Sequence, residues 1–265
     1  MVKTFRYTEM RPAALSERLA TKPIAIVPWG ALEWHGAHLP FGLDGLVAEA
    51  FSERLADSSG AVLLPTFYLP ITSLPHSHSL SLPSETVREV WASLFDELAR
   101  AGFELICLVS GHYAQGHEWV LTEVAETFTR SESSLVLAGT PLSLLEEPEL
   151  LDHAGRYETS QLLALRPDLV ELDALEPDDL PDPHHSAVLG GDPREATAVE
   201  GEELIALGVQ AWTDWIDRLV ASDDPAPLFD LYERRRRSYQ SYVDRYYEGS
   251  WEAAIQDWWE QAGTS

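Results

Sequence analysis

Residues 24–44 read Ile-Ala-Ile-Val-Pro-Trp-Gly-Ala-Leu-Glu-Trp-His-Gly-Ala-His-Leu-Pro-Phe-Gly-Leu-Asp, an apolar run followed by a loop with several polar side chains. The run 24–27 has the continuous apolar character of a strand that is buried on both faces. A segment with helical spacing of apolar residues, 46–56, follows the loop and ends before Ser58-Ser59-Gly60. This stretch therefore predicts a strand, a loop and a helix, in that order.

The same alternation continues along the chain. Further strands are expected at 61–64, 105–109 and 134–137, and further helices at 84–100, 118–128, 158–165 and 197–220. We expect Ser84 to be an N-cap and Gly102 to end the helix that begins there. Alternating strands and helices predict an α/β fold with a mainly parallel central sheet, and the Asp-, Pro- and Gly-rich segment 173–193 is expected to be mostly loop.

The last part of the chain differs in composition. Residues 222–227 have the character of a linker, and the segment beyond them is helical in pattern, rich in Tyr and Trp, and contains four arginines at 234–237. We expect a core domain over 1–222 and a helical, aromatic-rich extension over 223–265. The arginines suit either a phosphate site or packing against the same or a neighbouring subunit, and the acidic body beside them favours packing.

The charge of the chain is strongly negative. There are 44 acidic against 18 basic residues, a formal net charge of −26 at pH 7. Such a chain repels polyanions, so nucleic acid and anionic membrane surfaces are poor partners. Acidic residues are spread over the whole chain and the only lysines are Lys3 and Lys22. Because the Debye length is only about 3 Å at molar salt, this self-repulsion is screened there, and we infer a halophilic source.

Cysteine content and hydropathy indicate the compartment. A single cysteine, Cys107, excludes an intramolecular disulfide framework and a cysteine-based metal cluster. The N-terminal residues contain no apolar signal segment, and no stretch approaches the roughly 18 apolar residues that a membrane span needs. We therefore expect a cytoplasmic protein without a membrane partner.

Possible metal ligands follow the first strand. Glu33, His35, His38 and Asp44 all lie between that strand and the next helix. Loops at the carboxyl ends of parallel strands line the ligand crevice of an α/β sheet, and Glu, His and Asp suit divalent zinc or manganese. Taken alone, the cluster is equally compatible with a structural role, in which Asp44 caps the helix.

Two further clusters occupy comparable positions. Ser110-Gly111-His112-Tyr113 directly follows the strand at 105–109, so His112 is expected to face the same crevice. His117 lies five residues later and is expected to support the site without binding a metal. The segment 152–160, Asp-His-Ala-Gly-Arg-Tyr-Glu-Thr-Ser, opens a helix, and its carboxylates serve either chemistry or the helix dipole.

In order and spacing, the motifs Gly-Ala-Leu-Glu-x-His-Gly-x-His-Leu-Pro-x-Gly-x-Asp, Gly-His-Tyr and His-Ala-Gly-x-x-Glu-Thr-Ser resemble the creatininase (creatinine amidohydrolase) family. The similarity spans roughly residues 23–201. It implies a three-layer α/β/α fold and a binuclear metal centre. It also implies hydrolysis of a non-peptide C–N bond by a metal-bridging hydroxide, and a homo-oligomer, commonly a hexamer.

The resemblance also implies a ligand set. Glu33 and His112 would hold one divalent ion, His35 would hold the other, and Asp44 would bridge the two. Ala114 stands where creatininase proper has a glutamate, so Glu158 is the candidate for the vacant ligand position, with Asp152 as its competitor. Zinc, manganese and iron all suit these ligands.

Catalytic and substrate-binding roles follow in the same way. His153 matches the family's catalytic histidine and is expected to protonate the leaving amine, with Asp152 orienting it. Tyr113 and His78 are expected to contact the substrate. Ser110 replaces the family's usual asparagine and the segment 77–83 departs from the usual Phe-Pro-Gly-Thr, and both changes argue against creatinine itself as the substrate.

The expected function is therefore a metal-dependent amidohydrolase acting on a small cyclic amide or a formamide. Within the family, the alternatives are an archaeal formamidopyrimidine deformylase of riboflavin or deazaflavin biosynthesis and a peptidase-like member of mycofactocin maturation. From another class, the alternative is a non-catalytic, metal-stabilised binding or scaffold protein. Two bound ions favour the hydrolase, whereas a single closed, four-coordinate ion favours the scaffold.

Overall fold

The computed structural model describes residues 4–131, 134–147, 150–176, 178, 180–222 and 224–262. The strands are β1 (Phe5–Arg6), β2 (Ile24–Gly30), β3 (Val62–Leu63), β4 (Phe67–Tyr68), β5 (Leu105–Ser110) and β6 (Leu135–Gly139). The helices are α1 (Pro12–Leu19), α2 (Leu43–Ser59), α3 (Ser84–Ala101), α4 (Gln115–Ser131), α5 (Arg156–Leu165), α6 (Pro183–Ser186), α7 (Ala198–Ser222), α8 (Ala226–Tyr246) and α9 (Trp251–Gln261).

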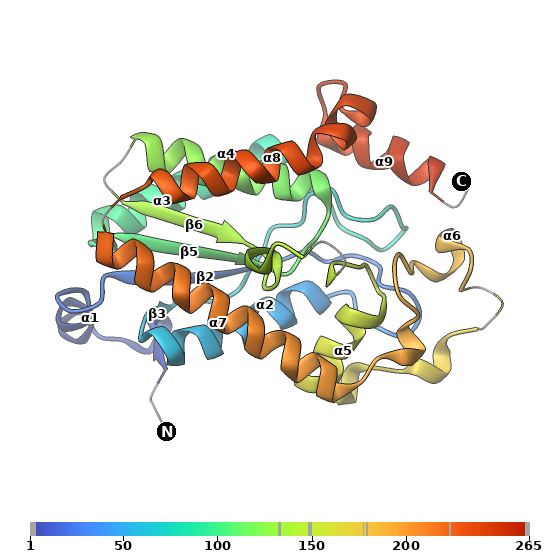
Figure 1. Ribbon diagram of the computed structural model, residues 1–265, viewed down its shortest axis with the longest axis horizontal. Coiled ribbons are helices and arrows are strands. Elements are labelled where there is room, and N and C mark those ends of the chain that lie inside the picture. The colour runs from blue at the N-terminus through green and yellow to red at the C-terminus, as the bar shows by residue number, and fades with distance from the viewer. Residues whose placement is uncertain are drawn as a thin grey trace.

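The described strands form one sheet in the order β1-β3-β2-β5-β6, with β4 pairing with the end of β2. Every pairing between these strands is parallel. Helices α3, α4 and α8 cover one face of the sheet, and α2 and α7 cover the other, with α5 packed against α7 and α2 near the ends of the strands (Figure 1). The predicted three-layer α/β/α fold with a mainly parallel sheet is therefore confirmed.

Strand β2 is the centre of the sheet and is buried along its whole length. It continues past the predicted end at residue 27 and includes Pro28, which has no N–H to give to a neighbouring strand. Pro28 pairs with Val109 of β5 on one side, while on the other side β3 stops beside Ile26 and β4 starts beside Trp29. Pro28 thus has no ladder partner on the side of β3 and β4, where its missing N–H leaves no bond unmade, and this explains why a central strand tolerates it.

The other predicted elements are found within a few residues of their expected ends, whereas α1 and the short strands β1 and β4 were not predicted. Gly102 ends α3 in the left-handed conformation with φ of 102°, as expected. The prediction for Ser84 is wrong, because Pro83 is the N-cap and Ser84 is the first helical residue. The Ser84 N–H instead donates to Glu252 Oε1 of α9 at 2.6 Å.

The C-terminal segment, α8 and α9, packs into the main hydrophobic core through buried residues such as Leu228, Tyr232 and Trp251. The predicted linker contains Asp223, which lies outside the described residues. The arginine run supports the packing interpretation, because Arg235 is buried and the other three pair with acidic side chains: Arg234 with Glu146, Arg236 with Glu126 and Arg237 with Glu233.

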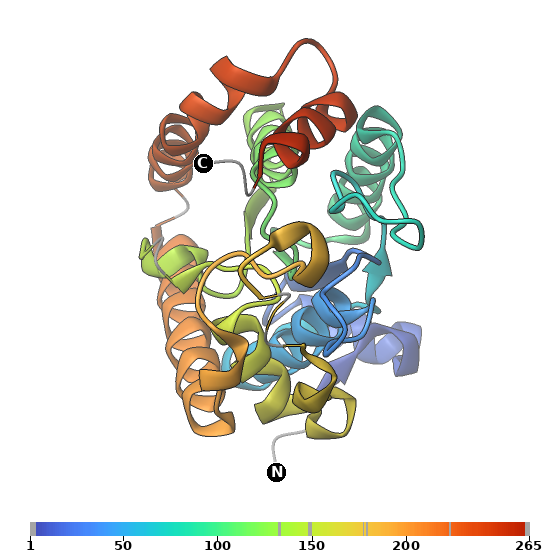
Figure 2. The ribbon, with the colours of Figure 1, turned by 90° about the vertical axis from the view of Figure 1, so that its right-hand side faces the viewer.

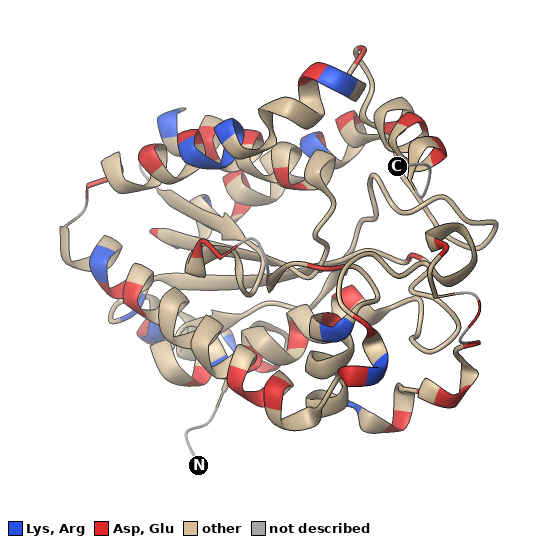
Figure 3. Cartoon of the chain, turned by 45° about the vertical axis from the view of Figure 1, so that its right-hand side comes forward, with Lys and Arg blue, Asp and Glu red and all other residues tan. Residues whose placement is uncertain are grey.

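Acidic residues lie on helices of both outer layers, as Figure 3 shows. The described helices include none that combines the length and the apolar character needed to cross a membrane. Figure 2 looks onto the end of the molecule where the parallel strands finish, and there α9 and the segment around α6 lie toward the viewer. The loops that carry the three sequence motifs are at this end.

Candidate metal centre

The three sequence motifs meet at the carboxyl ends of β2 and β5. Two of the predicted ligands lie in the loop after β2, and one lies in the segment directly after β5. The other two lie in the first turns of α2 and α5. Each of the five side chains belongs to a residue with at most 2% of its surface exposed: Glu33, His35, Asp44, His112 and Glu158. The structure therefore brings together all five residues that the sequence singled out as ligands.

Close packing of α2 against the strand ends carries Asp44 into the centre of this cluster. A Cβ atom at Gly30 would lie 2.3 Å from the Cα of Gly45, and one at Gly111 would lie 2.0 Å from the backbone oxygen of Asp44. No side chain fits at either position, so glycine is required there for steric reasons. Asp44 lies in the first turn of α2, whose N-cap is Gly42, so the helix-cap alternative for Asp44 is wrong.

Three groups of possible ligand atoms occur among the described residues: Glu33, His35 and His153 form one, and the other two share Asp44. One of these two consists of Glu33, Asp44 and His112, the other of His35, Asp44 and Glu158, and within each group the ligand atoms lie within 4.8 Å of one another. Asp44 Oδ1 is 3.1 Å from His35 Nε2, and Asp44 Oδ2 is 3.5 Å from His112 Nδ1. Each oxygen of this carboxylate thus faces a different histidine.

Backbone carbonyls orient the histidines of the site. The pairs are His35 Nδ1 with the oxygen of Glu33 at 3.1 Å, His112 Nε2 with that of Ile71 at 3.1 Å, and His153 Nε2 with that of Trp34 at 2.9 Å. A carbonyl oxygen only accepts, so the nitrogen beside it carries the proton and the opposite nitrogen of a neutral ring presents a lone pair. This is how proteins orient metal-binding histidines.

The protein atoms alone leave buried ligand atoms of the cluster without well-directed hydrogen bonds. Burial raises the pKa of Asp44 and raises that of Glu158 well above its ordinary value. Burial by itself lowers the pKa of His35, but Asp44, Glu158 and Glu33 outweigh it and raise this pKa to about 10. Both Asp44 oxygens and His35 Nε2 lack a well-directed hydrogen bond. Buried ligand atoms without well-directed hydrogen bonds, in a setting that attracts positive charge, fit a divalent cation.

Two other buried histidines hold the loops around the cluster. His38 Nε2 is 3.2 Å from Thr159 Oγ1, so it links the first motif to the third. His117 Nε2 is 2.7 Å from Ser110 Oγ, and that hydroxyl accepts a bond from the backbone N–H of His112. These contacts agree with the supporting role expected for His117.

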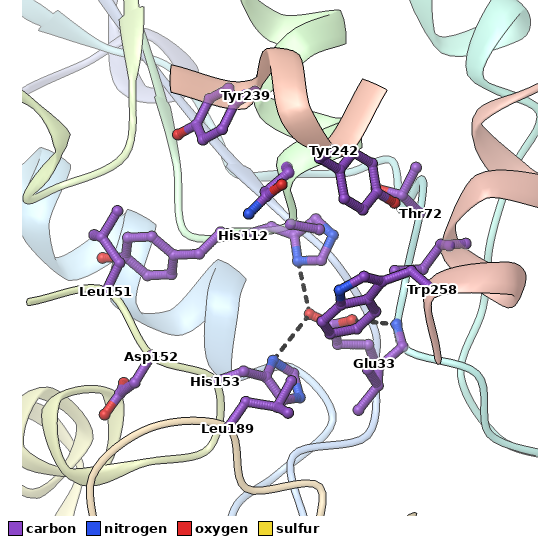
Figure 4. Close-up of a pocket in the computed structure, with 15 residues that line it drawn as sticks. Glu33, Thr72, His112, Leu151, Asp152, His153, Leu189, Tyr239, Tyr242 and Trp258 are labelled. Carbon is purple, nitrogen blue, oxygen red and sulfur yellow. Dashed lines mark hydrogen bonds and ion pairs between the residues drawn. The ribbon is translucent and has the colours of Figure 1, made fainter. Parts of the chain in front are cut away.

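Asp152 is placed differently from the expectation. Its Oδ2 accepts from the backbone N–H of Tyr157 at 2.7 Å, and its Oδ1 accepts from that of Glu158 at 3.1 Å. Figure 4 shows this carboxylate turned away from Glu33 and His153. The structure does not place Asp152 to orient His153, which is held by the carbonyl of Trp34 instead. The reason is local, since the first turn of α5 has free N–H groups that a carboxylate satisfies.

We expect Asp152→Ala to lower the free energy of unfolding by about 1–2 kcal/mol, as loss of a helix cap does. Asp152→Asn, which keeps an acceptor oxygen, should lose less. Urea denaturation measures both, and metal affinity measured alongside should fall in Asp152→Ala, because the same hydrogen bonds fix the turn that carries Glu158. Full stability together with lost turnover would instead assign Asp152 a catalytic role.

A cavity of about 320 Å³ opens beside the cluster. Glu33, His112 and His153 line its polar side (Figure 4). Tyr113, which is expected to contact the substrate, also lines the cavity. The structure does not place His78 where it was expected to contact the substrate, because this residue is exposed and is not among the residues that line the cavity. The centre of its ring lies 6.2 Å from that of Phe41. The loop 70–83 turns its histidines toward the surface.

Four residues of the C-terminal segment line the cavity and were not predicted from the sequence. They are Tyr239 and Tyr242 of α8 and Ile255 and Trp258 of α9. Each pair has a spacing of three residues, which places its members on one helix face. That spacing is visible in the sequence, but it does not show which part of the molecule the face contacts.

A family model described as creatininase, creatinine amidohydrolase, matches residues 8–216. The chain belongs to the creatininase family. Among curated relatives, creatinine amidohydrolase of Pseudomonas putida is 28% identical over 176 residues, which is 57% of this chain and 67% of that protein. The mycofactocin precursor peptide peptidase of Mycolicibacterium smegmatis is 29% identical over 220 residues, 74% of this chain and 85% of that protein.

Solved creatininase structures share the fold. A manganese form of creatininase superposes with a TM-score of 0.70 at 25% identity, covering 82% of this chain and 98% of that one. A glutamate-to-glutamine creatininase variant of the Zn–Zn type gives a TM-score of 0.66 at the same identity and coverage. The suspected membership of the creatininase family is thus confirmed.

Ala114 and Glu158 both lie at the site of this creatininase-family chain. Ala114 lines the cavity, and Glu158 Oε2 lies 3.7 Å from His35 Nε2 in the ligand cluster. The match to the family model ends at residue 216, before α8 begins at Ala226. The four lining residues of the C-terminal segment therefore lie outside the residues that match the family model.

Proposed function

We propose that this chain is a binuclear, metal-dependent amidohydrolase that cleaves a non-peptide C–N bond of a small cyclic amide or a formamide. The observation that carries the proposal is the buried carboxylate–histidine cluster in which two ligand groups share Asp44. Membership of a family described as creatinine amidohydrolase supports the reaction class. We further propose that it acts as a homo-oligomer, a hexamer by family resemblance, in the cytoplasm of a halophile.

In this proposal Glu33, His112 and Asp44 hold one divalent ion, and His35, Asp44 and Glu158 hold the other. Zinc or manganese suits these donors, and iron is compatible with them. When bound, two such ions polarise an amide carbonyl and make hydroxide available near neutral pH. The buried position of all five ligands keeps bulk water away from the reacting groups.

His153 is the proposed general acid. Its side chain is 15% exposed, against 1% for Glu33, so it reaches the cavity from the edge of the cluster. Its Nε2 proton is held by the carbonyl of Trp34, and its Nδ1 lies 3.8 Å from Glu33 Oε1. This Nδ1 takes up the proton that water releases on adding to the amide carbon and passes it to the nitrogen as the C–N bond breaks. The products are a carboxylic acid, which releases its proton at neutral pH, and an amine.

Metal content per chain, measured on protein purified in high salt, tests this function directly. We expect two divalent ions per chain, loss of both with loss of turnover on chelation, and recovery on adding Mn²⁺ or Zn²⁺. Turnover is followed as ammonia, amine or formate release from creatinine, related cyclic amides and formamidopyrimidines. A single, tightly held ion without turnover would contradict the hydrolase and support the scaffold alternative.

A second candidate is hydrolysis of an amide bond in a peptide. The similarity to the mycofactocin precursor peptide peptidase, over 85% of that protein's length, favours it. Short peptides and their amides therefore belong in the same panel. Cleavage of peptides alone would select this candidate, whereas formate release from formamidopyrimidines would select the deformylase.

A further inference from the structure

The C-terminal segment forms one side of the cavity at the metal ligands. Tyr239, Tyr242, Ile255 and Trp258 line it opposite the loops of the ligand cluster. Figure 4 shows that α8 and α9 carry the labelled Tyr239, Tyr242 and Trp258 toward the site. We call these four residues the C-terminal wall. All of them lie beyond residue 216, where the match to the family model ends.

Contacts at both ends of α9 hold this wall in place. At its start, Glu252 Oε1 accepts a hydrogen bond from the backbone N–H of Ser84 at 2.6 Å. The ring of Trp251 also packs against that of Trp119 of α4, with 5.9 Å between the ring centres. Near its end, His184 Nε2 donates to the backbone oxygen of Ala262 at 2.7 Å. A helix bound at both ends presents Ile255 and Trp258 in fixed positions, as a preorganised binding surface requires.

A second contact anchors the end of α9 near the ligand loops. Trp259 is buried in a cluster that includes Leu39 and Leu43, residues on either side of the loop-to-α2 junction. The ring of His184 also lies 4.5 Å from that of Trp259. The wall is therefore tied to the same segment that positions Asp44, so its distance from the ligand cluster is set by packing.

The chemistry of the lining indicates what it binds. The C-terminal wall faces a cavity whose other lining residues include Leu74, Leu151 and Leu189, so the space beyond the metal ligands is largely apolar. Its volume of about 320 Å³ is at the lower end of the range of roughly 300–1,000 Å³ for cavities that hold drug-sized ligands. Apolar and aromatic surfaces contribute binding free energy only when the ligand covers them with apolar groups.

We propose that the C-terminal wall selects the substrate: it binds an aromatic or branched apolar group attached to the amide whose C–N bond lies at the carboxylate–histidine cluster. This inference rests on the proposed amidohydrolase function. The substrate class is then an amide with a flat or branched apolar substituent, in place of a bare polar ring. Tyr242 and Trp258 are the specificity-determining residues.

A matched pair of probes tests the inference by binding alone. Acetohydroxamate and phenylacetohydroxamate carry the same metal-chelating head and differ by one phenyl ring. Calorimetric titration of the metal-loaded protein should give at least about tenfold tighter binding of the phenyl compound. In Trp258→Ala and in Tyr242→Ala this preference should fall to about threefold or less, while the Kd of acetohydroxamate stays the same.

Two control variants separate the wall from general effects on the fold. Trp258→Phe keeps an aromatic ring and should keep most of the preference. Trp215→Ala removes a half-buried tryptophan of α7 that is not part of the lining, and should leave the preference unchanged. Equal binding of both probes to the wild type, or an unchanged preference in Trp258→Ala and Tyr242→Ala, would overturn the proposal that the C-terminal wall selects the substrate. Failure of both probes to bind would instead contradict the metal centre and with it the proposed function.

Discussion

Replacing Asp44 by asparagine should lower amide hydrolysis at least about a thousandfold and reduce the bound metal to one ion per chain or fewer. Asp44 is the residue common to both ligand groups, and its two oxygens face His35 and His112. Asparagine has nearly the same shape but offers one neutral oxygen, so it cannot serve two ions. Ions in such a site contribute several kcal/mol to transition-state stabilisation, and about 1.4 kcal/mol corresponds to tenfold in rate.

Stability measured with chelator present tests whether this loss is caused by unfolding. Asp44 is fully buried, and its burial raises the pKa of the carboxyl group. A neutral amide avoids the cost of burying a charge, so metal-free Asp44→Asn should unfold at the same urea concentration as the wild type or at a higher one. Asp57→Asn, the same change at an exposed position of α2, is the matched control. Two ions and full turnover in Asp44→Asn would refute the bridging role.

The second large effect is expected in stability. Tyr232→Ala should lower the free energy of unfolding by about 4 kcal/mol, within the range of roughly 3–5 kcal/mol found for large aromatic residues cut to alanine. Tyr232 lies on α8, and none of its surface is exposed. Its hydroxyl donates to the backbone oxygen of Val136 and accepts from the N–H of Ala138 at 3.2 Å. Tyr232 therefore satisfies backbone groups of β6, the strand at the edge of the sheet.

Urea denaturation of a short series separates packing from hydrogen bonding. Tyr232→Phe keeps the ring and should cost about 1–3 kcal/mol, because two buried backbone groups lose their partner. Tyr246→Ala, at a half-buried position of the same helix, should cost clearly less than Tyr232→Ala. The division into a core domain over 1–222 and an extension over 223–265 is a proposal that this series also tests. If the main urea transition of Tyr232→Ala kept the stability of the wild type, the extension would fold independently of the core domain.

Local residue patterns were sufficient to predict an α/β fold with a mainly parallel sheet and to place the first two motifs at one crevice, whereas the three layers and the ligand assignments were implied by the family resemblance. The apolar runs at 24–27 and 105–109 are strands because continuous apolar residues suit a strand buried on both faces. Parallel strands end at the same edge of a sheet, so residues after two such runs must meet. This is why the sequence alone places Glu33, His35 and His112 together.

Packing between distant segments decided the remaining features. Asp152 accepts hydrogen bonds from the first backbone N–H groups of α5, because the helix begins only four residues after it. The loop 70–83 turns His78 to the surface. The spacing of Tyr239 with Tyr242, and of Ile255 with Trp258, shows which residues share a helix face. It does not show what covers that face, because this depends on contacts between residues more than a hundred positions apart. Only the folded chain places these four side chains at the cavity beside Glu33 and His112.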